Sequence, residues 1–189
     1  MADKTIMIIR HSEKPDGVNN GVGASGALDA KSLTPRGWQR SGAWAELFSP
    51  AFGTSKLPTP TKIFASAPAG HQEVAAGKGG SKSRRPLQTV TPLAEKLKIE
   101  IDLEFAKGDE TRLANALSAA DGVTLVCWQH ENIFEIANAL TPTPIGVPNT
   151  WPSTCFNVIF RFDRADGASA WTFKQVVPVL LDGDDPNHI

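Results

Sequence analysis

Thr5-Ile6-Met7-Ile8-Ile9-Arg10-His11 is the stretch that decides the fold class, because an apolar run here ends in an Arg-His pair. Such a run is typical of a strand that is covered on both faces, as in a parallel sheet flanked by helices. A second apolar run, Val123–Trp128, is followed two residues later by His130. Ligands of open α/β sheets bind outside the carboxyl ends of the strands, so we expect the two histidines to share one site.

The rest of the chain alternates between helical and extended patterns. Thr34 is a good N-cap and Pro35 a good first helical residue, which predicts a helix that ends near Phe48. Its residues expected to face the core are Trp38, Gly42, Ala45 and Leu47. Further strands are predicted at 62–66, 99–101, 157–162 and 171–177, and further helices from about 86, over 110–120 and over 133–140. This order predicts an α/β fold, a three-layer sandwich with a mostly parallel central sheet flanked by helices, formed by a single domain over residues 1–189.

Composition excludes several classes of function. The net charge of −1 gives no general basic surface for nucleic acid. No apolar run is long enough to span a membrane, and the N-terminus lacks the features of a signal peptide, so we expect a cytoplasmic protein. Cys127 and Cys155 are too few for a disulfide framework, and Cys127 in an apolar strand predicts a buried free thiol. No metal-ligand spacing and no Gly-x-x-x-x-Gly-Lys-Ser/Thr loop is present, so neither a metal nor a cofactor is predicted.

The predicted strand ends carry sequence signatures. Arg10-His11 resembles the Arg-His-Gly signature of the histidine phosphatase superfamily, which has the phosphoglycerate mutase-like fold, with Ser12 in the place of the glycine. Residues 33–39 resemble the Leu-Thr-x-x-Gly-x-x-Gln segment of that family, with Gln39 one place early.

Two further segments complete the resemblance. Ser66 and residues 85–89 are similar to the family's Ser-Pro and Arg-Ala-x-Gln-Thr segments, separated here by a Gly- and Ala-rich insertion. His130 is similar to its second catalytic histidine. The four pieces stand in the family's order on the expected elements and together cover most of the chain.

The resemblance implies a mechanism that uses the residues at the strand ends. A neutral His11 would attack phosphorus and form a phosphohistidine, which water then hydrolyses. Arg10, Arg85 and a protonated His130 would hold the phosphoryl oxygens, since an arginine fork matches two phosphate oxygens. The nearby cations disfavour protonation of His11. Lys14, three residues after His11, could also reach a substrate anion.

The leaving alkoxide needs a proton, and two carboxyl groups compete to supply it. Glu131 follows His130 directly, where the acid phosphatases and phytases of the family have the aspartic acid that serves as the acid. Glu110 lies 25 residues after Arg85, close to the place of the acid in the mutase branch. However, Glu110 begins a predicted helix, where carboxylates are favoured for capping alone. We therefore favour Glu131.

Each residue alone also fits an ordinary structural role, and the pattern decides between the two interpretations. His11 or His130 could be a packed histidine, and Arg84 competes with its neighbour Arg85. We favour Arg85 because it stands four residues before Thr89, as in the family that the sequence resembles. His71 and His188 are interpreted as bystanders. Lys78, Lys82 and Arg84 indicate a soluble loop or, as a weaker hypothesis, a lid over an anionic substrate.

The predicted function is that of a metal-independent phosphatase acting on a phosphomonoester. The alternatives are a phosphoglycerate mutase-type phosphotransferase, which would need a pocket closed to water, and a catalytically inert phosphate-binding module. The substrate is a phosphorylated small molecule or a phosphoprotein, and the pocket walls are expected from loops 16–32, 67–84 and 141–154. The sequence assigns no oligomeric state.

Overall fold

A computed structural model describes residues 3–70, 81–141 and 146–189 of the chain. Its elements are β1 (Lys4–Arg10), α1 (Pro35–Phe48), β2 (Lys62–Ala65), α3 (Arg85–Leu97), β3 (Ile101–Asp102), α4 (Glu110–Ala119), β4 (Gly122–Trp128), α5 (Ile133–Leu140), β5 (Ile159–Arg164) and β6 (Thr172–Val176). The predictions made for His71, for Lys78 and for parts of the loops 67–84 and 141–154 lie outside the described residues.

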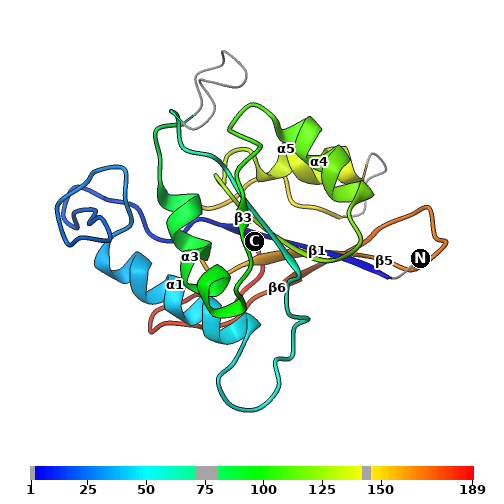
Figure 1. Ribbon diagram of the computed structural model, residues 1–189, viewed down its shortest axis with the longest axis horizontal. Helices are drawn as coiled ribbons and strands as arrows, with labels where there is room; N and C mark the ends of the chain where they lie inside the picture. Colours follow the sequence, from blue (N-terminus) through cyan, green and yellow to red (C-terminus); the bar gives the residue numbers. More distant parts are fainter. Residues whose placement is uncertain (1–2, 71–80, 142–145) are drawn as a thin grey trace.

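One six-stranded sheet, in the order β3-β2-β4-β1-β5-β6, forms the centre of the molecule (Figure 1). The first four strands in this order are parallel, β5 runs antiparallel to β1, and β6 runs antiparallel to β5. The apolar runs of β1 and β4 lie side by side in the middle, with Arg10 opposite Trp128. Their carboxyl ends therefore finish at the same level of the sheet, as the sequence predicts.

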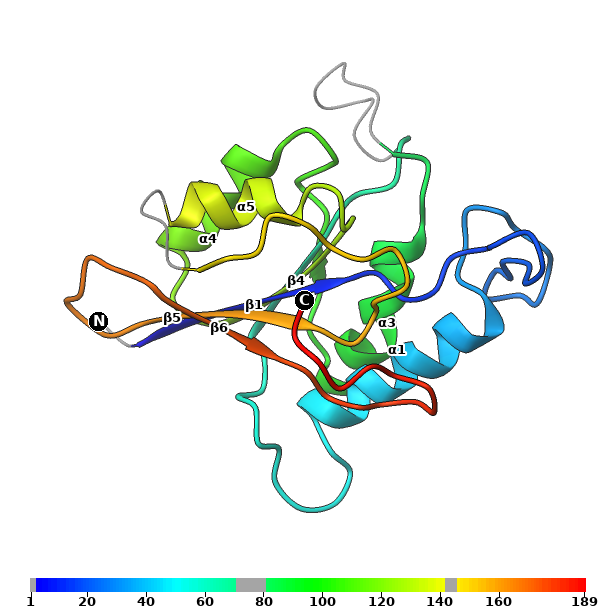
Figure 2. The ribbon, with the colours of Figure 1, turned by 180° about the vertical axis from the view of Figure 1, so that it is seen from behind.

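Helices cover both faces of the sheet, which confirms the predicted three-layer α/β architecture. Met7 and Ile9 of β1 pack with α1 and α3, whereas Ile6 and Ile8 pack with α4 and α5. Figures 1 and 2 show the two helix pairs on opposite sides of the strands. Because successive side chains of a strand point to opposite faces, a strand buried on both sides must be apolar throughout. This explains the continuous apolar run of β1.

Helix α1 begins as predicted but buries a partly different set of residues. Thr34 is its N-cap, and its Oγ1 accepts a hydrogen bond from the Gly37 backbone at 3.1 Å. The buried residues of α1 are Gly37, Arg40, Ser41, Trp44, Ala45 and Phe48. Of the residues predicted to face the core, Ala45 is buried and Leu47 packs against the core in part. The prediction was wrong for Gly42, which is exposed, and Trp38 is half-buried, with its indole donating to the Val22 carbonyl. Arg40, buried by ion pairs, was not expected on the inner face.

The remaining elements differ from the predictions in small ways. β3 is displaced to Ile101–Asp102, and α3 continues through Pro92 without a second start. Cys127 is a buried free thiol, as predicted. Among the described residues, no helix is both long enough and apolar enough to cross a membrane.

Candidate active site

The carboxyl ends of β1 and β4 bring the two predicted catalytic histidines to one edge of the sheet. The His11 backbone N–H donates to the Trp128 carbonyl at 3.0 Å, directly after the last register pair of the strands. The β2 end joins them, because the Gln129 amide donates to Ser66 Oγ at 3.0 Å. The three predicted strand ends thus form one site.

Arg10 is completely buried, and only part of its guanidinium is satisfied. Its Nη1 donates to the carbonyls of Pro152, Ser153 and Cys155 at 3.1, 2.8 and 2.9 Å. The guanidinium also lies over the Phe156 ring, 3.9 Å from the ring centroid. Its Nε and Nη2 have no hydrogen-bond partner. Burial lowers the pKa of Arg10 to about 10, which still leaves the group charged at neutral pH.

The ring of His11 is held in one tautomer, with its Nε2 free. Its Nδ1 lies 2.7 Å from the Ser12 carbonyl, which can only accept, so Nδ1 carries the proton and Nε2 keeps its lone pair. The side chain is 3% exposed. Burial and, to a smaller extent, the charges of Arg10, Arg85 and His130 together lower the pKa of His11 to about 3, although the Ser12 carbonyl opposes this change. The ring is therefore neutral at physiological pH.

The first turn of α3 carries Arg85 and holds it beside His11. Thr89 Oγ1 accepts the Ser12 N–H at 2.8 Å and donates to the Arg85 carbonyl at 2.8 Å. This double contact explains the four-residue spacing between Arg85 and Thr89. The Arg85 Nε is buried without a hydrogen-bond partner, whereas the Arg84 side chain is 63% exposed and pairs with Asp29. Of the two arginines, Arg85 is the one that belongs to the site.

His130 and Glu131 lie at the rim of the site together with Lys107. His130 Nδ1 is 2.9 Å from a Glu131 carboxylate oxygen, and the other oxygen accepts from Lys107 at 2.8 Å. Burial lowers the pKa of His130, and the charges of Arg10, Lys14 and Lys107 add to this effect against the attraction of Glu131. The surroundings of His130 therefore favour its neutral form in the absence of a bound anion. Burial raises the pKa of Glu131, but the Lys107 hydrogen bond and nearby charges bring it down to about 2.

Glu110 lies deeper than Glu131, behind β4. Its carboxylate accepts from the Trp128 indole at 3.0 Å and from the Gly108 backbone at 3.0 and 3.1 Å. The residue is 2% exposed and opens α4. Glu110 therefore holds the Trp128 indole and the N-terminal end of α4 in place.

Unsatisfied polar atoms concentrate at this site. Nine buried side-chain nitrogens and oxygens in the described chain have no hydrogen-bond partner, and all but Trp44 Nε1 belong to residues at the ends of β1 and β4 or the start of α3. These eight atoms belong to Arg10, Ser12, Glu13, Arg85, Gln129, His130 and Asn132. The His130 atom is the Nδ1 that makes the ion-pair contact with Glu131, so it is not free of contacts. Native proteins satisfy most buried polar groups, so such a cluster indicates a ligand with complementary charge. Its donors are Arg10 and Arg85, which select an anion.

Comparisons with known proteins agree with this geometry. No family model matches the chain, and no curated protein matches its sequence. Among solved structures, the protein histidine phosphatase SixA complexed with tungstate superposes with a TM-score of 0.56 at 17% identity, over 92% of this chain and 96% of that one. A structure described as mycobacterial hydrolase 2 superposes with a TM-score of 0.53 at 12% identity, over 94% of this chain and 91% of that one. The chain has the histidine phosphatase fold.

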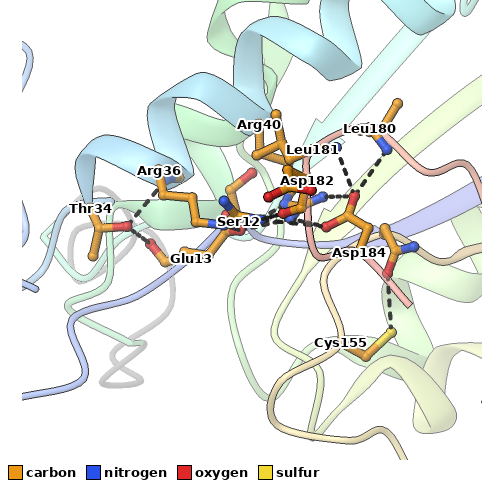
Figure 3. Close-up of polar contacts among 12 residues, drawn as sticks. Ser12, Glu13, Thr34, Arg36, Arg40, Cys155, Leu180, Leu181, Asp182 and Asp184 are labelled. Atoms are coloured by element: carbon orange, nitrogen blue, oxygen red, sulfur yellow. Dashed lines mark hydrogen bonds and ion pairs between the residues drawn. The ribbon is translucent and has the colours of Figure 1, made fainter. Parts of the chain in front are cut away.

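One buried charged residue of this histidine phosphatase fold, Arg40, was not predicted from the sequence. Gln39 is exposed, and the next residue, Arg40, is 2% exposed and points inward. Arg40 donates to Glu13 Oε1 at 2.8 and 2.9 Å and to both oxygens of Asp184 at 2.6 and 2.8 Å (Figure 3). Arg40 stands three residues after Gly37, where the family segment has its glutamine. That offset was the signal that could have identified it.

Two uncharged residues of the same segments were also missed. Gln88 holds the loop before α1, because its amide donates to Ser32 at 2.8 Å and accepts from the Leu33 backbone at 3.0 Å. Gly37 lets α1 approach the end of β1, since a Cβ there would lie 2.7 Å from the Glu13 carbonyl oxygen.

A cavity of about 720 Å³, which we call the tail pocket, lies beside the loop that follows β1. It is lined by residues from 13–19, from the first turns of α1, from 152–157 and from the tail 183–189. The loops 16–32 and 141–154 were predicted as walls, and both contribute. The C-terminal tail was not predicted. In the described part of the chain, no group of three or more His, Cys, Asp or Glu residues could hold a metal ion.

Lowering the pH from 7 to 4.5 is expected to remove about 2–3 kcal/mol of stability through His11 alone. The pKa of this histidine is about 3 in the folded protein and 6.5 when unperturbed. Between these values the unfolded chain binds a proton that the folded chain does not, so stability falls as the pH falls. Urea unfolding of the wild type and of His11→Asn at both pH values measures the difference. Equal losses in the two proteins would contradict the buried neutral state of His11.

Proposed function

We propose that the protein is a metal-independent phosphomonoesterase that works through a phosphohistidine on His11. The observation that carries the proposal is the set of unpaired, buried guanidinium nitrogens of Arg10 and Arg85 around a histidine whose Nε2 is free. Two fixed cations and a neutral nucleophile are what in-line attack on a phosphate ester needs. The tungstate complex named for SixA supports the choice of a tetrahedral oxyanion as ligand.

In the proposed reaction, His11 Nε2 forms a bond to phosphorus while the bond to the ester oxygen breaks. The leaving oxygen takes a proton from a carboxylic acid, and the alcohol departs. The carboxylate left by the first step then takes a proton from a water molecule whose oxygen attacks phosphorus, and the P–N bond breaks. Inorganic phosphate leaves, the acid is protonated again, and His11 returns to its neutral form. Arg10 and Arg85 hold the equatorial oxygens in both steps, and the incoming dianion raises the pKa of His130 so that it can join them.

Glu131 is the acid in this proposal. It lies beside His130 with a side chain that is 47% exposed, whereas the carboxylate of Glu110 is occupied by Trp128 and the start of α4. In the free protein Glu131 is ionised and paired with Lys107. A phosphate dianion next to this carboxylate would raise its pKa by like-charge repulsion, which prepares it to give up a proton to the leaving group.

Glu131→Gln is expected to slow hydrolysis of alkyl phosphates by about 10²-fold or more while changing the p-nitrophenyl phosphate rate little. An alkoxide needs a proton to depart, whereas p-nitrophenolate does not. The measurement is the ratio of kcat for glycerol 3-phosphate to kcat for p-nitrophenyl phosphate. Glu110→Gln is the matched control. If that variant lowers the ratio and Glu131→Gln leaves it unchanged, Glu110 is the acid.

Hydrolysis is favoured over a mutase reaction by the open rim of the site. The His130 and Glu131 side chains are 21% and 47% exposed, which gives water a path to the phosphohistidine. A mutase must exclude water from this intermediate. An inert phosphate-binding module is the other alternative.

The test is hydrolysis of p-nitrophenyl phosphate in the presence of EDTA, combined with rapid quenching. We expect turnover that survives chelation and a protein-bound phosphate that is stable in base and labile in acid, as a phosphoramidate is. Vanadate binding without turnover would favour the inert module, and loss of turnover in EDTA would contradict metal independence.

A further inference from the structure

The tail pocket has a built wall. Asp184 accepts the Leu180 and Leu181 backbone N–H groups at 2.9 and 3.0 Å and both arms of Arg40, so the tail is fixed to α1 (Figure 3). Asn157 holds the same segment from the other side, donating to the carbonyls of Pro178 and Asp185 at 3.2 and 2.8 Å. The wall is therefore ordered by buried charge and by backbone contacts.

Two residues that line the tail pocket also act on the proposed phosphate site, which is formed by the unpaired guanidinium nitrogens of Arg10 and Arg85. Phe156 lines the pocket and carries the Arg10 guanidinium on its ring. Lys14 lines the pocket too, and its ammonium acts on His130 at the rim of the site. A phosphate held by Arg10 thus has the pocket beside it. At about 720 Å³ the pocket is within the usual size range for a small organic ligand.

The charges of the tail pocket are unbalanced once internal pairs are counted. Arg36 and Arg40 are paired with Glu13 and Asp184. Of the lining charges this leaves Lys14, which acts on His130, and the two exposed carboxylates of Asp16 and Asp185. Asp16 accepts from the Val18 and Asn19 backbones, contacts that lower its pKa to about 2, so it is ionised at neutral pH.

We propose that the tail pocket receives the alcohol part of a small-molecule phosphomonoester, and that this alcohol is neutral or positively charged. The inference rests on the proposed phosphatase function and narrows its substrate class. Lys14 assists the phosphate, while Asp16 and Asp185 attract hydroxyl or ammonium donors and repel a second anionic group. A phosphorylated acid, a bisphosphate or a nucleotide is selected against.

The test compares three small esters: O-phosphoethanolamine, glycerol 3-phosphate and 3-phosphoglycerate. The last two differ chiefly by the carboxylate. We expect the wild type to show a kcat/KM for phosphoethanolamine and for glycerol 3-phosphate at least about tenfold above that for 3-phosphoglycerate. The double variant Asp16→Asn/Asp185→Asn keeps side-chain acceptors but removes both charges. It should reduce the ratio of kcat/KM for the first two esters to kcat/KM for 3-phosphoglycerate about three- to tenfold. Asp121→Asn, a matched change beside Lys4 at the other end of β1, should leave it unchanged.

The outcomes separate this inference from the function on which it rests. Hydrolysis of p-nitrophenyl phosphate with no discrimination among the three esters, or with a ratio that the double variant does not reduce, overturns the pocket proposal and leaves the phosphatase standing. Preference for 3-phosphoglycerate overturns it as well. Absence of all hydrolysis overturns both. Each Asp→Asn change is also made singly and checked by circular dichroism, so that a folding defect in the double variant does not decide the result.

Discussion

His11→Asn is expected to reduce the hydrolysis of p-nitrophenyl phosphate by on the order of 10⁴-fold or more while preserving the fold. The asparagine amide can still donate to the Ser12 carbonyl, as His11 Nδ1 does, so the loop after β1 keeps its contact. What disappears is Nε2, the atom that we propose attacks phosphorus. The measurement is the steady-state rate in EDTA, together with acid-labile phosphate on the protein, which should vanish.

Vanadate binding provides the control for this substitution. The donors of Arg10 and Arg85 remain in His11→Asn, so the variant should still bind the anion, with an affinity reduced far less than the rate. An activity that survives the substitution would remove His11 as the nucleophile. A loss of rate accompanied by a loss of vanadate binding would show instead that the substitution destroyed the anion site.

The grouping of the candidate site residues could be predicted from sequence because each of them lies at the end of a strand or in the first turn of a helix. Arg10, His11 and His130 directly follow apolar strands, and the end of a buried parallel strand is a place that a sequence reveals. Arg85 was chosen over Arg84 by its spacing from Thr89, and the contact of Thr89 with Ser12 gives that spacing a physical reason.

The parts that the sequence did not predict depend on long-range pairing. Arg40 reads as a surface residue of an amphipathic helix, because its burial requires Asp184, which lies 144 residues later. The tail pocket was missed for the same reason. The burial of Arg40 on the inner face of α1 was not predicted, because a hydrophobic pattern places an arginine on the surface. Here two carboxylates that the fold brings together stabilise the buried guanidinium.

Arg40→Met is expected to destabilise the protein by about 3–5 kcal/mol. Methionine fills similar space, but Glu13 and Asp184 would then face each other with only the half-exposed Arg36 between them. Burial lowers the pKa of Arg40, but the hydrogen bonds from Arg40 to Asp184 and Glu13 more than offset this and raise it, which shows how strongly the pair holds the charge. Urea unfolding measures the loss.

Arg112→Met is the matched control, since Arg112 also pairs with two carboxylates but is 56% exposed. Its loss should be no more than about 1 kcal/mol, because solvent screens an exposed pair. Adding Asp184→Asn to Arg40→Met removes one of the stranded charges and should restore part of the stability, so the two changes will not be additive. If Arg40→Met is no more destabilising than Arg112→Met, Arg40 does not hold the tail to α1, and the wall of the tail pocket needs another cause. A large loss of stability in Arg40→Met, partly recovered when Asp184→Asn is added, would show that one buried guanidinium fixes the tail to α1.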